Sequence, residues 1–205
     1  MPQGGDVRTR ILEVAARLFM EQGFAATSVR EIGERAAVGQ SSLYHHVQSK
    51  GHLLFQLHQS FSKDLVERLN AVVATNSSPT VQIRELVRVF LSAVESHQAE
   101  VTVFLREEHA LPDTYRQEIQ RDRDQVNAIV DGMIENGIAA GELRKDLDIR
   151  LARLGIMGMC NWTYQWFQPG GEHSGEQIAG FFADLIINGM AEPAKDLPMY
   201  QDAEA

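Results

Sequence analysis

The chain has 205 residues and carries 19 Lys and Arg against 28 Asp and Glu, a formal net charge of −9 at pH 7. Its 44% hydrophobic and 23% charged residues are typical of a globular protein and exclude a disordered chain. The longest apolar stretch, residues 154–160, is far short of the roughly 20 residues that span a bilayer, and one cysteine excludes an internal disulfide or a thiolate metal cluster. These limits, with few alternating β-branched runs, predict an all-α cytoplasmic protein that contacts no membrane.

The N-terminal part predicts three helices. Apolar residues at helical spacing indicate a helix over 7–22, which Asp6 can cap. A capping box that opens at Ser28 indicates a second helix over 28–36, and a short third helix is expected over 40–47. One longer helix followed by two short helices with a tight turn between them is the helix-turn-helix arrangement, so we expect a helix-turn-helix domain over residues 1–50.

The third helix exposes polar side chains that suit DNA. A recognition helix needs amide or hydroxyl groups near its N-terminus to reach base edges, and hydroxyl or cationic groups beyond them to hold phosphates. The first need is met by Gln40, Ser41 and Ser42, and the second by Tyr44, His45 and Lys50. On spacing alone, the alternative is a solvated helical corner. A metal site at His45 and His46 is not expected, because adjacent side chains point about 100° apart on a helix.

The whole segment is more specific than its parts. The chain resembles the DNA-binding region of the tetracycline-repressor (TetR) family of bacterial transcription regulators over residues 11–53, ILEVAARLFMEQGFAATSVREIGERAAVGQSSLYHHVQSKGHL. The matches at fixed spacing are Ala15, Phe19, Gly23, Thr27, Ile32, Ala36, Leu43–His46, Ser49 and Lys50. This resemblance implies a homodimer that binds double-stranded DNA at a palindromic operator and whose C-terminal helices hold a small molecule that switches DNA affinity.

The resemblance also implies roles for single residues. Thr27 or Ser28 would contact a backbone phosphate, Gln40, Ser41 and Ser42 would face bases, and Tyr44, His45 and Lys50 would hold phosphates. Three positions depart from the family pattern: Ala37 replaces the usual turn glycine, Val47 a phenylalanine, and Gly51 an acidic residue. Ala37 is expected to accept a strained turn at a cost of about 1 kcal/mol, which leaves the fold intact.

Longer helices follow, and we expect them to form a ligand-binding and dimerisation domain over residues 51–190. Stripes and breaks place the helices at about 50–76, 79–97, 98–110, 113–140, 148–167 and 174–190, about nine in all, with a flexible tail at 191–205. No glycine-rich phosphate loop, nucleophile elbow or paired-histidine motif occurs in them, so we do not expect an enzyme.

The helix expected over 148–167 is apolar nearly all round, so protein must cover both of its faces. Paired with the last helix, it can form a four-helix seam with a second subunit, the arrangement that the TetR family uses. Gly155 and Gly158 would let backbones approach closely there. The alternative is that these glycines make room for large neighbours within one subunit.

Residues 158–171, GMCNWTYQWFQPGG, resemble the helix-eight signature of TetR regulators that respond to acyl-coenzyme A thioesters in lipid, steroid-ring or aromatic-acid breakdown. Gln165 stands where that subgroup commonly has a basic residue for the coenzyme A phosphates. The residues expected at the ligand are Phe104, Met133, Met157, Asn161, Trp162, Gln165 and Trp166. For the apolar ones the alternative is plain core packing. Arg123 is expected to be solvated, or to hold an anionic ligand at the pocket mouth.

These expectations combine in a ligand-responsive repressor with no cofactor beyond its small-molecule effector. In the apo dimer the recognition helices would lie about one turn of DNA apart, and ligand would shift the fourth helix and spoil this spacing. The alternative function is a helical small-molecule carrier or enzyme with a vestigial DNA-binding domain. An activator would share the same sequence features as a repressor.

Overall fold

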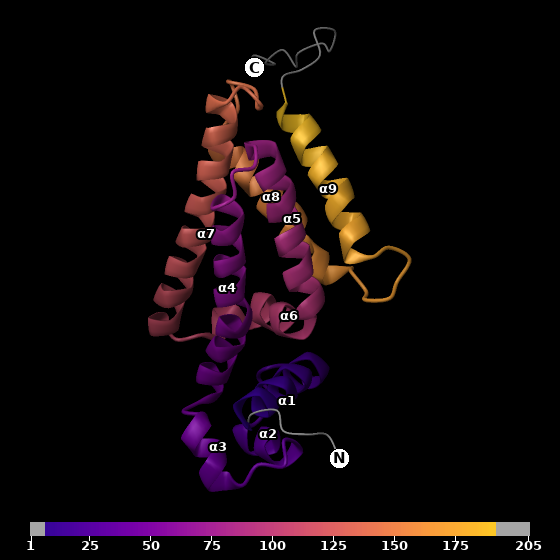
Figure 1. The fold of residues 1–205 in the computed structure, drawn as a ribbon. Coiled ribbons are helices and arrows are strands. Elements are labelled where there is room, and N and C mark those ends of the chain that lie inside the picture. The colour runs from indigo at the N-terminus through magenta and orange to yellow at the C-terminus, as the bar shows by residue number, and fades with distance from the viewer. Residues whose placement is uncertain (1–6, 192–205) are drawn as a thin grey trace, which may run out of the picture.

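The computed structural model describes residues 7–191, so Asp6 and residues 192–205 of the expected tail lie outside the described range. Within that range the chain forms nine α-helices and two short 3-10 helices and no β-strand, which confirms the all-α prediction (Figure 1). The helices are α1 (Val7–Gln22), α2 (Val29–Arg35), α3 (Gln40–His46), α4 (Lys50–Val73), α5 (Pro79–Ser96), α6 (Gln98–Glu107), η1 (Glu108–Ala110), α7 (Asp113–Ala139), α8 (Ile149–Trp162), η2 (Thr163–Gln165) and α9 (Gly175–Met190). None of these is both long and apolar enough to cross a membrane.

Side-chain caps fix where several helices begin. The hydroxyl of Ser28 accepts a hydrogen bond from the backbone N–H of Glu31 at 3.1 Å, and Ser49 caps α4 in the same way. Ser174 and Gln177 form a reciprocal capping box at the start of α9. Each cap satisfies a backbone donor that the first turn leaves unpaired, and the cap predicted at Ser28 places the start of α2 correctly.

Helix α8 is shorter than expected. The α-helix ends at Trp162 and continues as the 3-10 helix η2, whereas the apolar pattern indicates a helix to residue 167. The hydroxyl of Thr163, which is fully buried, donates to the carbonyl of Cys160 at 2.6 Å. A 3-10 turn has three residues per turn, so the side chains beyond Trp162 leave the faces that α-helical spacing predicts.

The helices pack around two apolar cores that share α4. Helices α1–α3 form the lower end of the molecule and α5, α7, α8 and α9 the upper part, with α4 running between them (Figure 1). The lower core also contains α6 and α7 side chains, and its members include Ile11, Leu18, Ile32, Leu43, Leu53, Leu54, Leu57, Val103, Phe104, Leu111 and Ile119. Each such buried side chain stabilises the fold by roughly 1.5–3 kcal/mol. Helix α6 therefore packs against the helix-turn-helix part.

The turn between α2 and α3 is tight in two ways. Ala37 has φ of +52°, the one positive φ at a non-glycine residue among residues 7–191. A Cβ added to Gly33 would lie 2.5 Å from Cδ2 of Leu43, so the glycine lets α2 and α3 approach closely. The strained geometry expected at Ala37 is present, because the turn requires it whichever residue occupies the position.

Replacing Ala37 with glycine is expected to raise the free energy of unfolding by about 0.5–1 kcal/mol. The left-handed region costs an L-residue about 1–2 kcal/mol, of which the extra chain entropy of glycine offsets a part. Urea titration of parent and variant measures the difference. Ala140→Gly is the matched control, since Ala140 is exposed and right-handed with φ of −75° and should be slightly destabilised. Equal effects at both positions would contradict the strain.

Candidate nucleic-acid interface and ligand pocket

Helix α3 presents the polar side chains that sequence spacing predicts. Leu43 is 2% exposed and anchors the helix in the lower core, whereas Tyr44 is 56% exposed. The predicted base-facing and phosphate-holding residues of this helix are all exposed: Gln40, Ser41, Ser42, Tyr44 and His45. Their spacing around Leu43 leaves one continuous polar face, so the structure brings these five together as the hypothesis requires.

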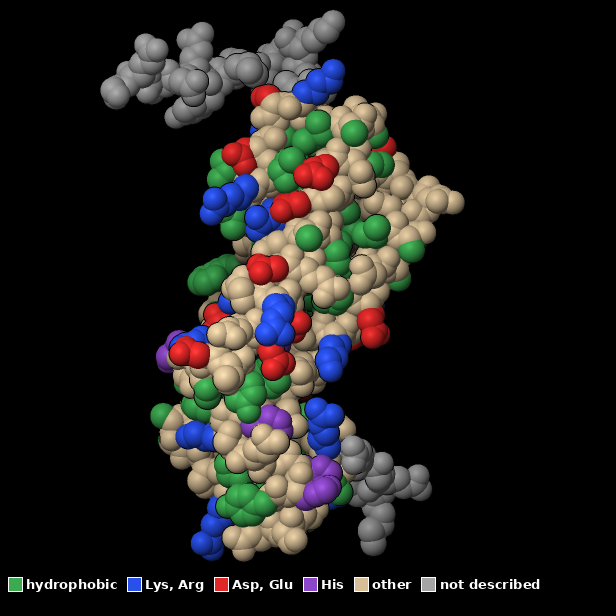
Figure 2. All heavy atoms as spheres, turned by 90° about the vertical axis from the view of Figure 1, so that its left-hand side faces the viewer, with side chains coloured by type: hydrophobic (Ala, Val, Ile, Leu, Met, Phe, Trp, Pro, Cys, Tyr) green, Lys and Arg blue, Asp and Glu red, His purple; other side chains and the backbone are tan. Residues whose placement is uncertain are grey.

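Charge is distributed unevenly over the molecule. On the face shown in Figure 2, the lower end carries Lys, Arg and His side chains, whereas the upper part carries Asp and Glu together with Lys and Arg. Residues 1–50 hold six basic and five acidic side chains, and the rest of the chain holds 13 and 23. A local basic surface suffices to attract phosphates, even in an acidic protein.

Thr27 and Lys50, both predicted to hold phosphates, use their polar groups in contacts within the chain. Thr27 is 2% exposed, and its hydroxyl donates to the carbonyl of Gly23 at 2.8 Å. The ammonium of Lys50 donates to the carbonyls of Phe24, Ala25 and Thr27 at 2.7, 3.0 and 3.0 Å. All three ammonium donors are therefore used within the chain. Lys50 ties α4 to the turn before α2, and Thr27 closes that turn.

Ser28 is different, because its side chain is exposed at the N-terminus of α2 while its hydroxyl oxygen caps the helix. The cap uses only the hydroxyl oxygen as an acceptor, so the O–H hydrogen can still be donated to a phosphate. Of the two residues predicted for this contact, the geometry favours Ser28 over Thr27.

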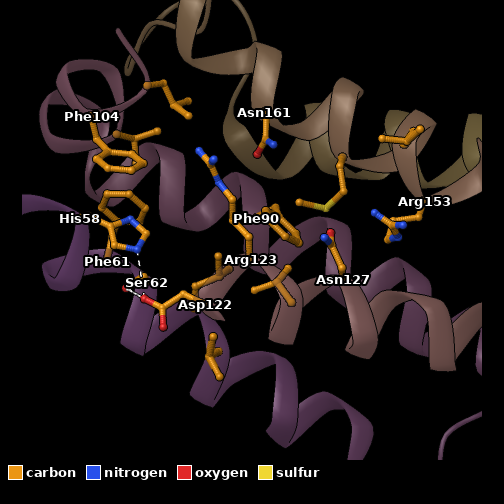
Figure 3. A pocket seen from close by; sticks show the side chains of 17 residues that line it. His58, Phe61, Ser62, Phe90, Phe104, Asp122, Arg123, Asn127, Arg153 and Asn161 are labelled. Carbon is orange, nitrogen blue, oxygen red and sulfur yellow. Dashed lines mark hydrogen bonds and ion pairs between the residues drawn. The ribbon is translucent and has the colours of Figure 1, made fainter. Parts of the chain in front are cut away.

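A pocket of about 280 Å³ lies among α4, α5, α6, α7 and α8 (Figure 3). Its wall is largely apolar, with a few polar groups, as is typical of small-molecule sites. The lining residues include His58, Phe61, Ser62, Phe90, Phe104, Asp122, Arg123, Asn127, Arg153, Met157 and Asn161. The volume lies at the lower end of the roughly 300–1,000 Å³ of ligand pockets.

The pocket contains three of the seven residues expected at a ligand, namely Phe104, Met157 and Asn161. Met133 does not line this pocket, because it is 2% exposed and belongs to the upper core. Trp162, Gln165 and Trp166 do not line it either, since all three are exposed on the outside. Trp162 follows Asn161 by about 100° around α8, and the 3-10 turn carries the next residues away from the pocket.

Helix α8 has two distinct faces. Arg153, Met157 and Asn161 point to the pocket, at four-residue spacing. The opposite stripe continues onto α9 as an exposed apolar face whose large members are Leu151, Trp162, Phe181 and Leu185, 51–66% exposed. A Cβ added to Gly155 or Gly158 would meet no atom of residues 7–191 within 4 Å. These glycines therefore do not make room for a neighbour within the subunit, which removes that alternative.

Polar pairs on the pocket wall join different helices. Arg153 of α8 lies 2.7 Å from Asp131 of α7, and Arg123 of α7 hydrogen-bonds Glu108 of η1. Both pocket arginines thus already have carboxylate partners. Arg123 lies at the pocket wall with 42% of its side chain exposed, as expected for the pocket-mouth alternative.

Sequence reasoning missed His58 and Asp122, which lie 64 residues apart. Nε2 of His58 on α4 is 3.1 Å from Oδ2 of Asp122 on α7, and the histidine is 4% exposed. Burial lowers the pKa of His58 below its ordinary value of 6.5, against the opposing effect of the Asp122 hydrogen bond. The available signal was a histidine within the apolar stripe of α4, next to Leu57 and Phe61.

The lowered pKa of His58 makes folding pH-dependent. Below about pH 6.5 the unfolded chain takes up a proton that the buried imidazole resists, so the free energy of unfolding falls as pH falls. Urea titrations between about pH 7.5 and 5.5 should show a steeper fall for the parent than for His58→Gln, which lacks the titrating group. Parallel curves would contradict a buried neutral imidazole.

Family models match both parts of the chain. Residues 11–57 match the model described as "Bacterial regulatory proteins, tetR family", and residues 76–190 match "Tetracyclin repressor-like, C-terminal domain". The chain is 28% identical over 190 residues to the HTH-type transcriptional repressor KstR2 of Rhodococcus jostii strain RHA1, covering 91% of this chain and 92% of the relative. It is 29% identical over 191 residues to KstR2 of Mycolicibacterium smegmatis, covering 92% and 93%.

Solved structures agree with these matches. The ketosteroid transcriptional regulator KstR2 of Mycobacterium tuberculosis superposes with a TM-score of 0.85 at 28% identity, covering 93% of this chain and 98% of that one. AibR, solved in complex with isovaleryl coenzyme A and operator DNA, superposes with a TM-score of 0.77 at 27% identity, covering 88% and 97%.

Proposed function

This chain belongs to the TetR family of bacterial transcription regulators, and from this premise we propose that it is a homodimeric repressor released from a palindromic operator by an acyl-CoA thioester. As a member of that family it is a DNA-binding regulator and not an enzyme. The named relatives over most of its length are repressors, and they give no support to a carrier with a vestigial DNA-binding domain. The proposed place of action is the cytoplasm, where the operator would lie.

The DNA contacts in this proposal come from one face. Gln40, Ser41 and Ser42 at the start of α3 would enter the major groove, because short polar side chains there can reach base edges. Tyr44, His45 and Ser28 would hold phosphates on either side. All six side chains are exposed. Two such faces must lie about 34–36 Å apart to meet successive major grooves, which requires a dimer.

The exposed apolar face of α8 and α9 supports that dimer. Large apolar side chains at Trp162, Phe181 and Leu185 are 51–63% exposed within the described part of the chain. A two-fold axis through this face would bury the same stripe on both copies, as isologous dimers do. The bare surface at Gly155 and Gly158 would let the two α8 helices approach closely.

The observation that carries the switch is the position of the pocket against α4. This helix begins at Lys50, beside the helix-turn-helix part, and forms a pocket wall at His58, Phe61 and Ser62. A ligand that binds better to one tilt of α4 would therefore shift the spacing of the two recognition helices. A preference of about 1.4 kcal/mol changes the ratio of the two states tenfold.

An acyl-CoA is favoured as effector class by the relative AibR, which was solved with isovaleryl coenzyme A. At about 280 Å³ the pocket would enclose the acyl part and leave the coenzyme A outside. Gln165, which replaces a basic residue of that subgroup, lies outside the pocket. The loss of a basic side chain at this position therefore leaves the contacts between the pocket and the acyl part unchanged.

The test is selection of genomic fragments by the purified protein, repeated with a panel of acyl-CoA thioesters. We expect enrichment of an inverted repeat and its loss on addition of one thioester. A repeat that no thioester affects would overturn the effector class and keep the regulator. No enriched fragment even at low salt would overturn DNA binding itself, since low salt strengthens phosphate contacts.

A further inference from the structure

The imidazole of His58 is enclosed by aromatic rings at one wall of the pocket. Its ring centroid lies 4.5 Å from that of Phe104 and 5.4 Å from that of Phe61 (Figure 3). The side chain is 6% exposed, and Nε2 is hydrogen-bonded to the carboxylate of Asp122. A polar ring is thus buried among apolar groups with one of its two nitrogens bonded.

The second nitrogen has no partner. The carboxylate of Asp122 can only accept a hydrogen bond, so Nε2 must carry the hydrogen of the Asp122 contact. Because burial lowers the pKa of His58, the ring is neutral near pH 7 and Nδ1 holds a lone pair. Nδ1 is buried and receives no hydrogen bond from any residue between 7 and 191. Buried acceptors are nearly always satisfied in folded proteins, so this one requires an explanation.

We propose that the effector of this pocket carries a hydroxyl group that donates a hydrogen bond to Nδ1 of His58. This inference rests on the proposed function for the existence of an effector and adds the polar group by which the site recognises it. His58 and Phe61 both line the pocket, so a ligand that enters it meets this wall.

Other polar groups fit this position less well. A ketone or thioester carbonyl only accepts hydrogen bonds and would place its lone pairs against that of Nδ1. A carboxylate or phosphate would also meet the negative charge of Asp122. An ammonium needs three acceptors, which the flanking rings of Phe61 and Phe104 do not provide. A hydroxyl has one donor to place and no charge to desolvate.

The rest of the pocket agrees with an otherwise apolar ligand. The guanidinium groups of Arg123 and Arg153 are paired with Glu108 and Asp131, so each positive charge already has a carboxylate partner. The wall between them is formed by side chains such as Phe90, Val126 and Met157. Among the described residues that line the pocket, Nδ1 of His58 is the buried side-chain acceptor that lacks a hydrogen-bond donor.

Two isomeric probes test the inference, namely 1-octanol and heptyl methyl ether. They have the same atoms and nearly the same length, but only the alcohol can donate a hydrogen bond. Isothermal titration of the parent should show at least roughly tenfold tighter binding of the alcohol, as one hydrogen bond formed in a buried site provides. Partition out of water alone would favour the less polar ether. Equal affinities, or no saturable binding of the alcohol, would overturn the inference.

A variant of His58 without ring nitrogens tests the acceptor directly. Phenylalanine keeps the size of the ring and has no hydrogen-bonding atom, so His58→Phe removes the acceptor and should abolish the preference for the alcohol. Asn127→Ala removes a pocket amide that is not part of the His58 contact and should change both affinities alike. An unchanged preference in His58→Phe would overturn the inference.

A spectroscopic measurement on the parent does not depend on how the variants fold. In protein with nitrogen-15 histidine, the Nδ1 signal of His58 should shift on addition of the alcohol and not of the ether, because only the alcohol donates to the lone pair. Identical responses would contradict the contact. If the Nδ1 signal does not respond to the alcohol while thioesters still release DNA, the inferred hydroxyl contact is wrong and the proposed function stands. If the fragment selection fails, the proposed function itself is wrong.

Discussion

Replacing Phe181 with glutamate is expected to convert the dimer into a monomer and to weaken binding to an inverted repeat by at least about a hundredfold. Phe181 is 63% exposed on the apolar face of α8 and α9. In a two-fold interface the substitution occurs twice, so two buried aromatic side chains, each worth about 1.5–3 kcal/mol, are exchanged for two carboxylates. A monomer then meets only one half-site of the operator.

Sedimentation equilibrium measures the mass, and titration of the selected fragment measures the affinity. Val73→Glu is the control, since Val73 is 44% exposed at the end of α4, belongs to neither α8 nor α9, and receives the same apolar-to-acidic change. It should remain dimeric with parental affinity. A dimeric Phe181→Glu variant would show that another surface joins the subunits.

Replacing Lys50 with methionine is expected to lower the free energy of unfolding by about 2–3 kcal/mol. The ammonium donates three hydrogen bonds to the carbonyls of Phe24, Ala25 and Thr27 and lies 4.6 Å from the centre of the Phe24 ring. Methionine keeps the stem and leaves these carbonyls without their charged donor. Urea titration at fixed pH measures the loss.

The expected result differs from that of a phosphate-holding lysine. Loss of a phosphate contact would leave stability unchanged and would reduce the salt dependence of operator binding. Lys63→Met is the control, because Lys63 is exposed on the same helix and receives the same substitution. Equal free energies of unfolding for the parent and Lys50→Met would contradict a stabilising role of these hydrogen bonds and would favour a phosphate contact for Lys50.

Local signals allowed much of the fold to be predicted. Capping residues such as Ser28 and Ser174 satisfy backbone donors within three residues of themselves, so the sequence alone contains both partners. The polar face of α3 follows from the same short-range periodicity, because Leu43 must be buried and its neighbours must then be exposed. The strain at Ala37 was also predictable, since the turn dictates the conformation.

Contacts between distant segments were not accessible in this way. His58 meets Asp122 across 64 residues, and Lys50 meets backbone carbonyls, which leave no trace in residue types. Trp162 illustrates a third limit. Its apolar side chain is compatible with a pocket, a core or a subunit interface. Its exposure is set by how α8 is rotated against its neighbours and by where the helix turns into η2.

The contribution of α6 to the lower core bears on how such regulators can be recombined during evolution or engineering. Val103, Phe104 and Leu111 follow α5 in the chain, yet together with Leu53 and Leu54 they belong to the same apolar core as the side chains of α1–α3. A chimera spliced at residue 50 would separate two halves of one apolar surface and pair each with a foreign counterpart. To exchange DNA specificity and keep function, a chimera therefore has to include the α6 residues of the lower core as well. The alternative is to change only the exposed side chains of α3.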